Sequence, residues 1–383
     1  MDKKKNRINQ KGLIVLGMLL AIGSATLHSS GKTAANFLKI PAGVRNVGMG
    51  ETGAASLDIN SIYYNPAGLG WLTKPELTFS HNQHFQDVYL EHIAGAMPIR
   101  DWGVFGLSVY YLGMSDIAGY DGSGTAAGSV SANDSAVSLS YSRYVMGERI
   151  EGNGLCVGGT LKYIHSKLDD ASGSGVGLDL GVEHLFAPSA YTLDNSLSVG
   201  LSIQNLGSKI KYDSKSAGLP VNLRLGALYS IVGHNMKPSI ALDLTKSSDS
   251  DAYAGLGGEV WIRDILALRV GYASKGSRAT DGGLRFGVGL KSYGLTMDYA
   301  YAGYGDLGTE HRVGLSINFD TVGGQVSSGP ADVNKVFQRG VELFNQERWL
   351  EATLEFNKVL ELDSTNKDAL DYMRRANEKL NKK

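Results

Sequence analysis

Residues 76–319 form short runs in which apolar and polar residues alternate. In one run, Leu284 and Phe286 flank Arg285, and the alternation continues to Leu290. A period of two places successive side chains on opposite faces of a β-strand, so each run predicts a strand with one apolar and one polar face. About fourteen runs are present, beginning near residues 76, 88, 103, 134, 154, 175, 196, 221, 238, 252, 265, 283, 294 and 310.

The content of the polar face decides between two architectures. A soluble β-sandwich buries its apolar faces between two sheets, whereas a membrane β-barrel turns them toward lipid and keeps small and polar residues inside. Here the polar face is rich in Gly, Ser and charged residues, and many tyrosines fall near the ends of runs, as interfacial aromatic girdles require. We therefore predict an all-β fold, an antiparallel transmembrane barrel of about 14 strands over residues 76–320, with a soluble secreted β-protein as the alternative.

The charged residues of the polar face are predicted to lie in the lumen of this barrel. Arginines and carboxylates that face the same interior can pair across it and form a structural ion network. The alternative function is a polar path that conducts or selects a solute. The predicted lumen charges are Lys162, Asp179, Glu183, Arg224, Asp243, Glu259, Arg269, Arg285, Asp298 and Arg312.

The connections between runs indicate which end of the barrel faces outward. If the N-terminus lies in the periplasm, the odd-numbered connections face out, and they average about ten residues against about six for the even-numbered ones, as expected for outer-membrane barrels. The two longest outward connections span residues 113–133 and 207–220. An even number of strands then leaves the C-terminal tail in the periplasm.

The first 25 residues have the pattern of an export signal. A positively charged start is followed by the apolar run of residues 12–23, which is shorter than the roughly 20 residues needed to span a bilayer as a helix. Small residues at Gly23 and Ala25 predict cleavage, with the mature chain starting near Thr26. A short membrane anchor is the alternative.

Residues 26–75 differ from both the signal and the strands. The stretch 37–69 is rich in Gly and Ala and shows neither helical nor strand periodicity over any length. Pro66 suits the first turn of a helix, and Asn65 suits its N-cap. The glycines of this stretch permit tight turns. We predict that residues 26–75 form a hatch folded inside the lumen.

The chain changes character again after the last run. Residues 321–330 form a small-residue linker, and residues 331–383 are charged with helical periodicity. Part of this tail resembles a single tetratricopeptide repeat, although Ser364 stands where that repeat usually has Pro and Arg339 replaces an apolar residue. A third helix is predicted over 367–380. The tail is either a helical hairpin that docks on a partner or a peptide-binding module. Its predicted packing or partner face contains Gly340, Leu343, Ala352 and Phe356.

Composition and motifs narrow the function. Gly accounts for 50 of 383 residues, which is high for a globular chain, while the net charge of −1 gives no reason to expect a nucleic-acid partner. The single cysteine, Cys156, excludes a disulfide framework. No P-loop, HExxH, GxSxG or CxxC motif is present, so we expect no enzyme activity, cofactor or metal. His81 and His84 fall in or just after the first strand and are not expected to bind a metal.

Two groups of residues resemble a known family. The N-terminal group is Phe37-Leu38-x-Ile40-Pro41-x-Gly43-x-Arg45-x-x-Gly48-Met49-Gly50, followed by Tyr63-Tyr64-Asn65-Pro66-Ala67-Gly68-Leu69. It resembles the signature of the PorV/PorQ family, within the wider group of barrels similar to the long-chain fatty-acid transporter FadL. Near the end of the barrel, Leu268-Arg269-x-Gly271-Tyr272, Asp298-Tyr299-Ala300-Tyr301 and Gly305-Asp306-Leu307-Gly308-x-x-His311-Arg312 agree with it. The resemblance covers about residues 35–319, and the helical tail lies outside its usual pattern.

The resemblance implies a fourteen-stranded barrel in the outer membrane of a Gram-negative-type envelope, surrounded by outer-membrane lipid, with a hatch in its lumen. It leaves two functions open. One is a component of type IX-like protein secretion or surface attachment, which binds secretion machinery or exported cargo. The other is passive transport of a hydrophobic small-molecule ligand. The hatch residues carried over from the family are Pro41, Gly43, Arg45, Gly48, Met49, Gly50, Asn65, Pro66, Ala67 and Gly68.

Overall fold

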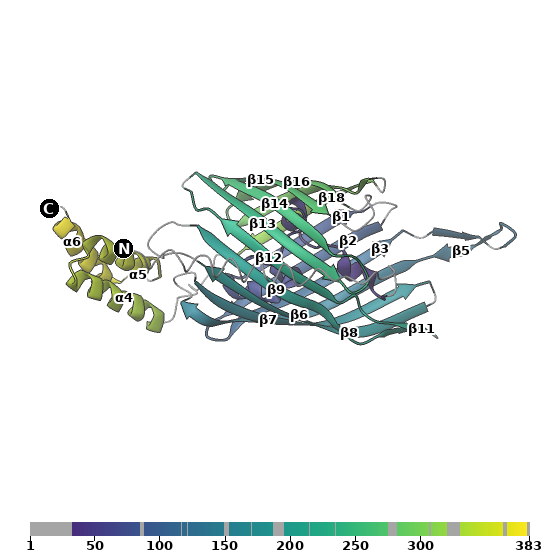
Figure 1. Cartoon of the computed structure of the whole chain (residues 1–383), viewed down its shortest axis with the longest axis horizontal. Coiled ribbons are helices and arrows are strands. Elements are labelled where there is room, and N and C mark those ends of the chain that lie inside the picture. The colour runs from purple at the N-terminus through teal and green to yellow at the C-terminus, as the bar shows by residue number, and fades with distance from the viewer. Residues whose placement is uncertain are drawn as a thin grey trace, which may run out of the picture.

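The computed structural model describes residues 33–84, 88–115, 117–120, 122–148, 153–169, 171–186, 195–213, 215–233, 235–274, 282–305, 308–319, 330–362 and 366–380. The predicted signal peptide and nearly all of the predicted linker lie outside these residues. The structure confirms the predicted fold class: an antiparallel barrel encloses an N-terminal hatch, and a small helical tail follows it (Figure 1).

Fourteen strands form the barrel, each paired antiparallel with its neighbours, and β18 pairs back onto β1 to close it. Every predicted strand start lies within four residues of an observed one. The barrel strands are β1 (Glu76–Gln83), β2 (Val88–Ile99), β3 (Gly103–Met114), β6 (Ala132–Glu148), β7 (Asn153–Leu168), β8 (Ala171–Phe186), β9 (Ser196–Gly207), β12 (Asn222–Ser230), β13 (Met236–Ser247), β14 (Tyr253–Ile262), β15 (Leu266–Ser274), β16 (Gly283–Ser292), β17 (Leu295–Gly303) and β18 (Thr309–Asn318).

The two faces of the wall have the polarity of a membrane barrel. Apolar side chains on the outer face are open, as in Leu161 and Ile240, which are 58% and 60% exposed. The alternate positions point inward and are buried even where they carry a charge, as at Arg285 and Glu183. Exposed apolar side chains outside and buried polar ones inside are the arrangement expected of a barrel wall that faces lipid.

The two ends of the barrel differ. At one end, which we call the hairpin end, the two longest connections fold into small two-stranded sheets, and β5 extends beyond the barrel rim (Figure 1). At the opposite end, the closing end, β1 begins and β18 finishes, with the Phe319 amide donating to the Pro75 carbonyl at 2.9 Å. The small sheets are β4 (Ile117–Tyr120) with β5 (Ala126–Val130), and β10 (Ile210–Tyr212) with β11 (Lys215–Ala217).

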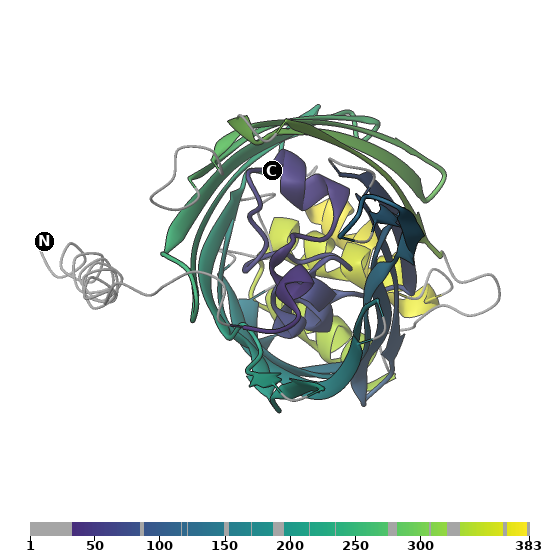
Figure 2. The same ribbon diagram turned by 90° about the vertical axis from the view of Figure 1, so that its right-hand side faces the viewer.

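The hatch occupies the lumen, as the view along the barrel shows (Figure 2). Its short helices are η1 (Asn36–Lys39), α2 (Val44–Gly48), α3 (Ser61–Tyr64) and η2 (Pro66–Trp71). The Asn65 side chain accepts a hydrogen bond from the Ala67 amide and caps η2, with Pro66 in its first turn. The chain enters the lumen at the hairpin end, where the Ala34 amide donates to the Gly218 carbonyl, and it leaves at the closing end into β1.

Glycines in the wall allow the hatch to press against it. A Cβ atom on Gly158 would lie 2.5 Å from the Pro66 carbonyl carbon, and one on Gly271 would lie 2.0 Å from the Gly50 nitrogen. Neighbouring Gly159 faces the other way, and its nearest contacts would be ordinary ones at 3.5 Å or more. Part of the glycine excess therefore lies where the backbone of the hatch meets the backbone of the barrel.

The tail contains α4 (Pro330–Asn345), α5 (Trp349–Leu362) and α6 (Lys367–Leu380), which share one core. A Cβ on Gly340 would lie 2.6 Å from the Phe356 ring, so the glycine permits close approach of α4 and α5. Leu343, Ala352 and Phe356 are all buried in this core. No helix in the described ranges is long and apolar enough to cross a membrane. The likeness of the tail to a tetratricopeptide repeat stays a prediction.

Substitution of the paired glycines tests the contact between hatch and wall. We expect Gly158→Val to reduce the free energy of unfolding by about 1–3 kcal/mol, because its side chain overlaps the Pro66 backbone. Gly159→Val, one residue along the same strand, is the matched control and should change stability little. Urea unfolding of the purified barrel in detergent measures both. Equal effects of the two substitutions would contradict the close packing described here.

Candidate functional site

An apolar cluster fills the lumen at the hairpin end. Phe37 and Leu38 of η1 pack with wall residues that include Tyr110 and Ile164, and all four are buried. The Tyr110 hydroxyl donates to the Ile40 carbonyl at 2.6 Å. The first helix of the hatch therefore plugs this end by apolar packing and a wall-to-hatch hydrogen bond.

A polar contact holds the start of the hatch beside this cluster. Asp249, in the connection between β13 and β14, accepts hydrogen bonds from the Thr33 hydroxyl and from Lys39 Nζ, the latter at 2.9 Å. Partial burial alone would raise the pKa of the Asp249 carboxyl. The hydrogen bonds from Thr33 and Lys39, together with the lysine charge, instead hold that pKa below its usual range. The carboxylate is therefore ionised at neutral pH and keeps both partners.

Midway along the lumen, Arg45 of the hatch joins a network of wall charges. Its guanidinium lies 2.8 Å from Glu259 and 2.7 Å from Asp58 of the hatch. Glu259 also pairs with Arg269, which pairs in turn with Asp298, both at 2.6 Å. Arg45 therefore has carboxylate partners from both the wall and the hatch.

Three further wall charges bind the hatch directly. Arg285 lies 3.2 Å from the Glu51 carboxylate, and both side chains are fully buried. Arg312 donates to the Pro41 carbonyl and pairs with neighbouring Glu310. The Asp243 carboxylate accepts hydrogen bonds from the Gly53 and Ala54 amides at 2.7 and 2.8 Å. The wall therefore binds both the charges and the backbone of the hatch.

The remaining predicted charges serve other contacts. Asp179 pairs with Lys162 at 2.7 Å and accepts from the Asn205 amide, at a bulge between β8 and β9. Glu183 accepts from Ser198. Arg224 donates to Gln204 and lies 5.2 Å from the centre of the Tyr64 ring. Of the arginine–carboxylate pairs considered from the sequence, the structure brings together Arg269 with Glu259 and Asp298.

Sequence reasoning missed the hatch partners of these charges. Glu51 and Asp58 are acidic residues in a stretch composed mainly of small and apolar ones, which was the available signal. The predicted lumen charges also omit Glu310, the wall partner of Arg312, which lies inside the family motif from Gly305 to Arg312. Removing one partner of a buried pair leaves an uncompensated charge, so these residues matter as much as the predicted arginines.

The other residues of the hatch motif have local roles. Gly43 and Gly50 have backbone φ angles of 77° and 72°, which residues with a side chain rarely adopt. Gly48 lies against Gly287 of the wall, and Met49 is buried. A Cβ on Gly68 would lie 2.2 Å from the Ser56 carbonyl oxygen. Each glycine thus permits a turn or a close approach, within the hatch or between hatch and wall.

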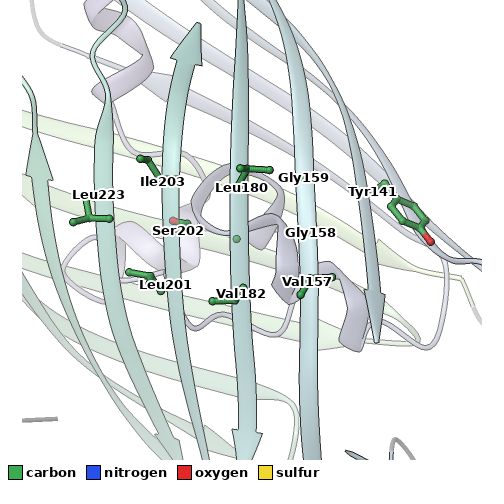
Figure 3. Close-up of a pocket in the computed structure, with 11 residues that line it drawn as sticks. Tyr141, Val157, Gly158, Gly159, Leu180, Val182, Leu201, Ser202, Ile203 and Leu223 are labelled. Atoms are coloured by element: carbon green, nitrogen blue, oxygen red, sulfur yellow. The ribbon is translucent and has the colours of Figure 1, made fainter. Parts of the chain in front are cut away.

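The larger hollows around the filled lumen, in the part of the chain that the structure describes, include a polar one and an apolar one. A polar one of about 360 Å³ lies toward the closing end and is lined by residues that include Arg45, Asp58, Glu76 and Lys291. The other, which we call the wall hollow, has a volume of about 590 Å³ and lies on the lipid-facing side of β7, β8, β9 and β12 (Figure 3). Side chains lining it include Leu180, Leu201 and Leu223.

Metal chemistry has no evident site among the residues that the structure describes. No group of three or more His, Cys, Asp or Glu side chains that could hold an ion occurs there. His81 lies 2.6 Å from Glu91, and His84 lies 3.5 Å from Glu310, so the two histidines face different partners.

The closed antiparallel wall, its apolar outer face and its charged, hatch-filled lumen define an outer-membrane β-barrel. Comparison with known families agrees with this class. The family model of the type IX secretion system protein PorV matches residues 26–248, more than half of the chain. The chain belongs to this family.

The solved structures to which the chain is similar include two toluene transporters and a FadL homologue. The Ralstonia pickettii toluene transporter TbuX is 12% identical, with a TM-score of 0.49, over 73% of this chain and 98% of that one. A Pseudomonas aeruginosa FadL homologue is 12% identical, with a TM-score of 0.45, over 77% of this chain and all of that one. The P. putida toluene transporter TodX is 10% identical, with a TM-score of 0.48 and coverage of 73% and 99%. No curated protein matches the chain.

The Arg285–Glu51 pair offers a direct test of how the hatch is held. We expect Arg285→Met to destabilise the barrel by about 3–5 kcal/mol, because it removes one member of a buried ion pair. The double variant Arg285→Met with Glu51→Gln should recover part of this loss. Urea unfolding and protease sensitivity of residues 33–75 measure the two effects. A single variant with wild-type stability would show that the pair does not fix the hatch.

Proposed function

We propose that this barrel works as a closed scaffold in type IX-like protein secretion or surface attachment, binding secretion machinery or exported cargo at its hairpin end. The observation that carries the proposal, beside the family match, is the fixed hatch. Apolar packing, Asp249, and the Arg45 and Arg285 ion pairs hold it along the length of the lumen. A scaffold of this kind needs no open lumen, and we expect no catalytic activity.

The alternative function is passive transport of a hydrophobic small molecule. It requires the hatch to move, and movement would separate several buried ion pairs, each costly to break. The hollow at the closing end is polar and charged, which does not suit a hydrophobic ligand. Both considerations favour the scaffold.

The hairpin of β4 and β5 is the proposed contact with a partner protein. It extends beyond the barrel rim, and within the described residues its strands pair only with each other (Figure 1). Two strands alone are marginally stable in water, and their outer edges leave backbone groups available for a third strand. A partner that adds a strand to this edge would stabilise the hairpin and gain main-chain hydrogen bonds.

We further propose that the hairpin end faces the cell exterior and the helical tail lies in the periplasm. The proposal is supported by the position of the two longest connections at one end and by the exit of the chain at the other. A periplasmic tail would be free to contact another envelope protein. The buried Gly340, Leu343, Ala352 and Phe356 then serve its internal packing, leaving exposed residues such as Leu350 for a partner.

Cysteine labelling in intact cells tests the orientation. Asn36 at the hairpin end and Gln346 in the tail are both exposed. We expect Asn36→Cys to react with a membrane-impermeant maleimide in intact cells, and Gln346→Cys to react only after the outer membrane is permeabilised. The unaltered chain, whose Cys156 is buried, is the control. The reverse labelling pattern would overturn the orientation.

Affinity purification from gently solubilised membranes tests the scaffold function. We expect partner proteins to co-purify with the barrel, and their yield to fall about tenfold when residues 117–130 are replaced by a short Gly-Ser linker, as expected when a central contact is lost. Ser123→Ala with Thr125→Ala, which alters only the hairpin tip, is the matched control and should retain them. A barrel recovered with a bound fatty acid and without partner proteins would support the transporter instead.

A further inference from the structure

The wall hollow includes a gap in a row of lipid-facing residues. Across five neighbouring strands, Tyr141 pairs with Gly159, Gly159 with Leu180, Leu180 with Ile203, and Ile203 with Leu223. Gly159 interrupts the row because it has no side chain, and its ideal Cβ position meets nothing closer than 3.5 Å. The sticks in Figure 3 show this row on the strands in front of the hatch.

The floor of the hollow separates it from the lumen. Behind it, the hatch backbone at Pro66 and Ala67 lies against Gly158, as the glycine contacts show. The side-chain amide of Asn65 donates to the Val182 carbonyl at 3.1 Å, and the Ser202 hydroxyl donates to the Tyr64 carbonyl at 2.8 Å. Because hatch and wall are bonded here, an occupant enters the hollow from the membrane.

The size and chemistry of the hollow indicate its occupant. Its eleven lining residues carry no charged side chain, and its volume of about 590 Å³ lies in the range of small-molecule sites, about 300–1,000 Å³. A stable protein interface needs roughly 20–30 residues on each side, about twice this number or more. Leu180, Leu201 and Leu223 are 40–47% exposed, on the face that contacts lipid.

We propose that the wall hollow is a binding site for one hydrocarbon chain, supplied by the acyl chain of a membrane lipid. An empty hollow would leave its lining side chains without contact atoms on one side, and in a bilayer only hydrocarbon is present to supply them. Recognition rests on shape, with the chain lying over Gly159 between Tyr141 and Leu180. The site is independent of the proposed role in secretion, because it involves the lipid-facing wall and not the hairpin end.

Photo-crosslinking tests this site. The full-length barrel is reconstituted in phosphatidylethanolamine vesicles that contain a fraction of lipid with a diazirine in its acyl chain, and adducts are mapped on peptides. We expect adducts on Leu180 and Ile203 to exceed those on lipid-facing residues of β14 about threefold, because a chain in the hollow gains van der Waals contacts that an open wall does not offer. Adducts spread evenly around the wall would overturn the proposal.

Variants that fill the hollow complete the test. Gly159→Leu should reduce the excess labelling to the level of the rest of the wall. If that variant fails to fold, Val182→Phe, which adds bulk from the neighbouring strand, should have the same effect. Gly258→Leu on β14 is the matched control: its added Cβ meets nothing closer than 3.9 Å, and it should leave the excess intact. Retained labelling in a folded Gly159→Leu variant, or crosslinks from this surface to a protein in native membranes, would contradict an acyl-chain site.

Discussion

The structure depends on pairing charges that the barrel wall points inward. Arg285 and Arg312 are essentially fully buried, where an unpaired charge is several kcal/mol too costly to keep. Their partners come from both the wall and the hatch: Glu310 of the wall pairs with Arg312, whereas Glu51 and the Pro41 carbonyl belong to the hatch. Hatch and wall are therefore two parts of one electrostatic unit. This explains why a segment with little regular secondary structure of its own holds a fixed conformation.

Backbone packing reinforces this pairing. Small residues in the wall let the hatch approach to direct contact at Gly158 and Gly271, so little space for water is left between them. The same strands present leucines to lipid on their other face. Over β7, β8 and β9 a single thickness of backbone separates hatch from hydrocarbon. Packing against the hatch on the inner face of these strands therefore limits which substitutions their lipid-facing side can accept.

The barrel could be predicted from the sequence because strand periodicity and membrane polarity are both local signals. The run from Leu284 to Leu290 shows them together, as an apolar outer face and an inner face with Arg285. The prediction was least accurate for β8, which begins at Ala171 and not near residue 175. Its first residues, ASGSG, carry no apolar face. Strands β6 to β8 have 16 or 17 residues, more than the 9–11 that span a bilayer, so part of each needs no apolar face.

The ion partners could not be predicted in the same way. The Arg285–Glu51 pair joins residues 234 positions apart, and its formation depends on how the hatch lies in the lumen. The bulge at Asn205 and the wall hollow likewise arise from strand register and not from any motif. The sequence identified the charges that needed partners and the segment that filled the lumen, but not which atoms would meet.

The path of the hatch has a consequence for biogenesis. The segment runs from the Asp249 contact at the hairpin end to β1 at the closing end, so it passes through the whole enclosure before the first strand begins. Threading it into a finished cylinder from the closing end would carry its apolar first helix through the charged part of the lumen to the far end. We therefore expect β1 and β18 to pair last, after the hatch has taken up its position. The hatch would then serve as a template around which the barrel wall closes.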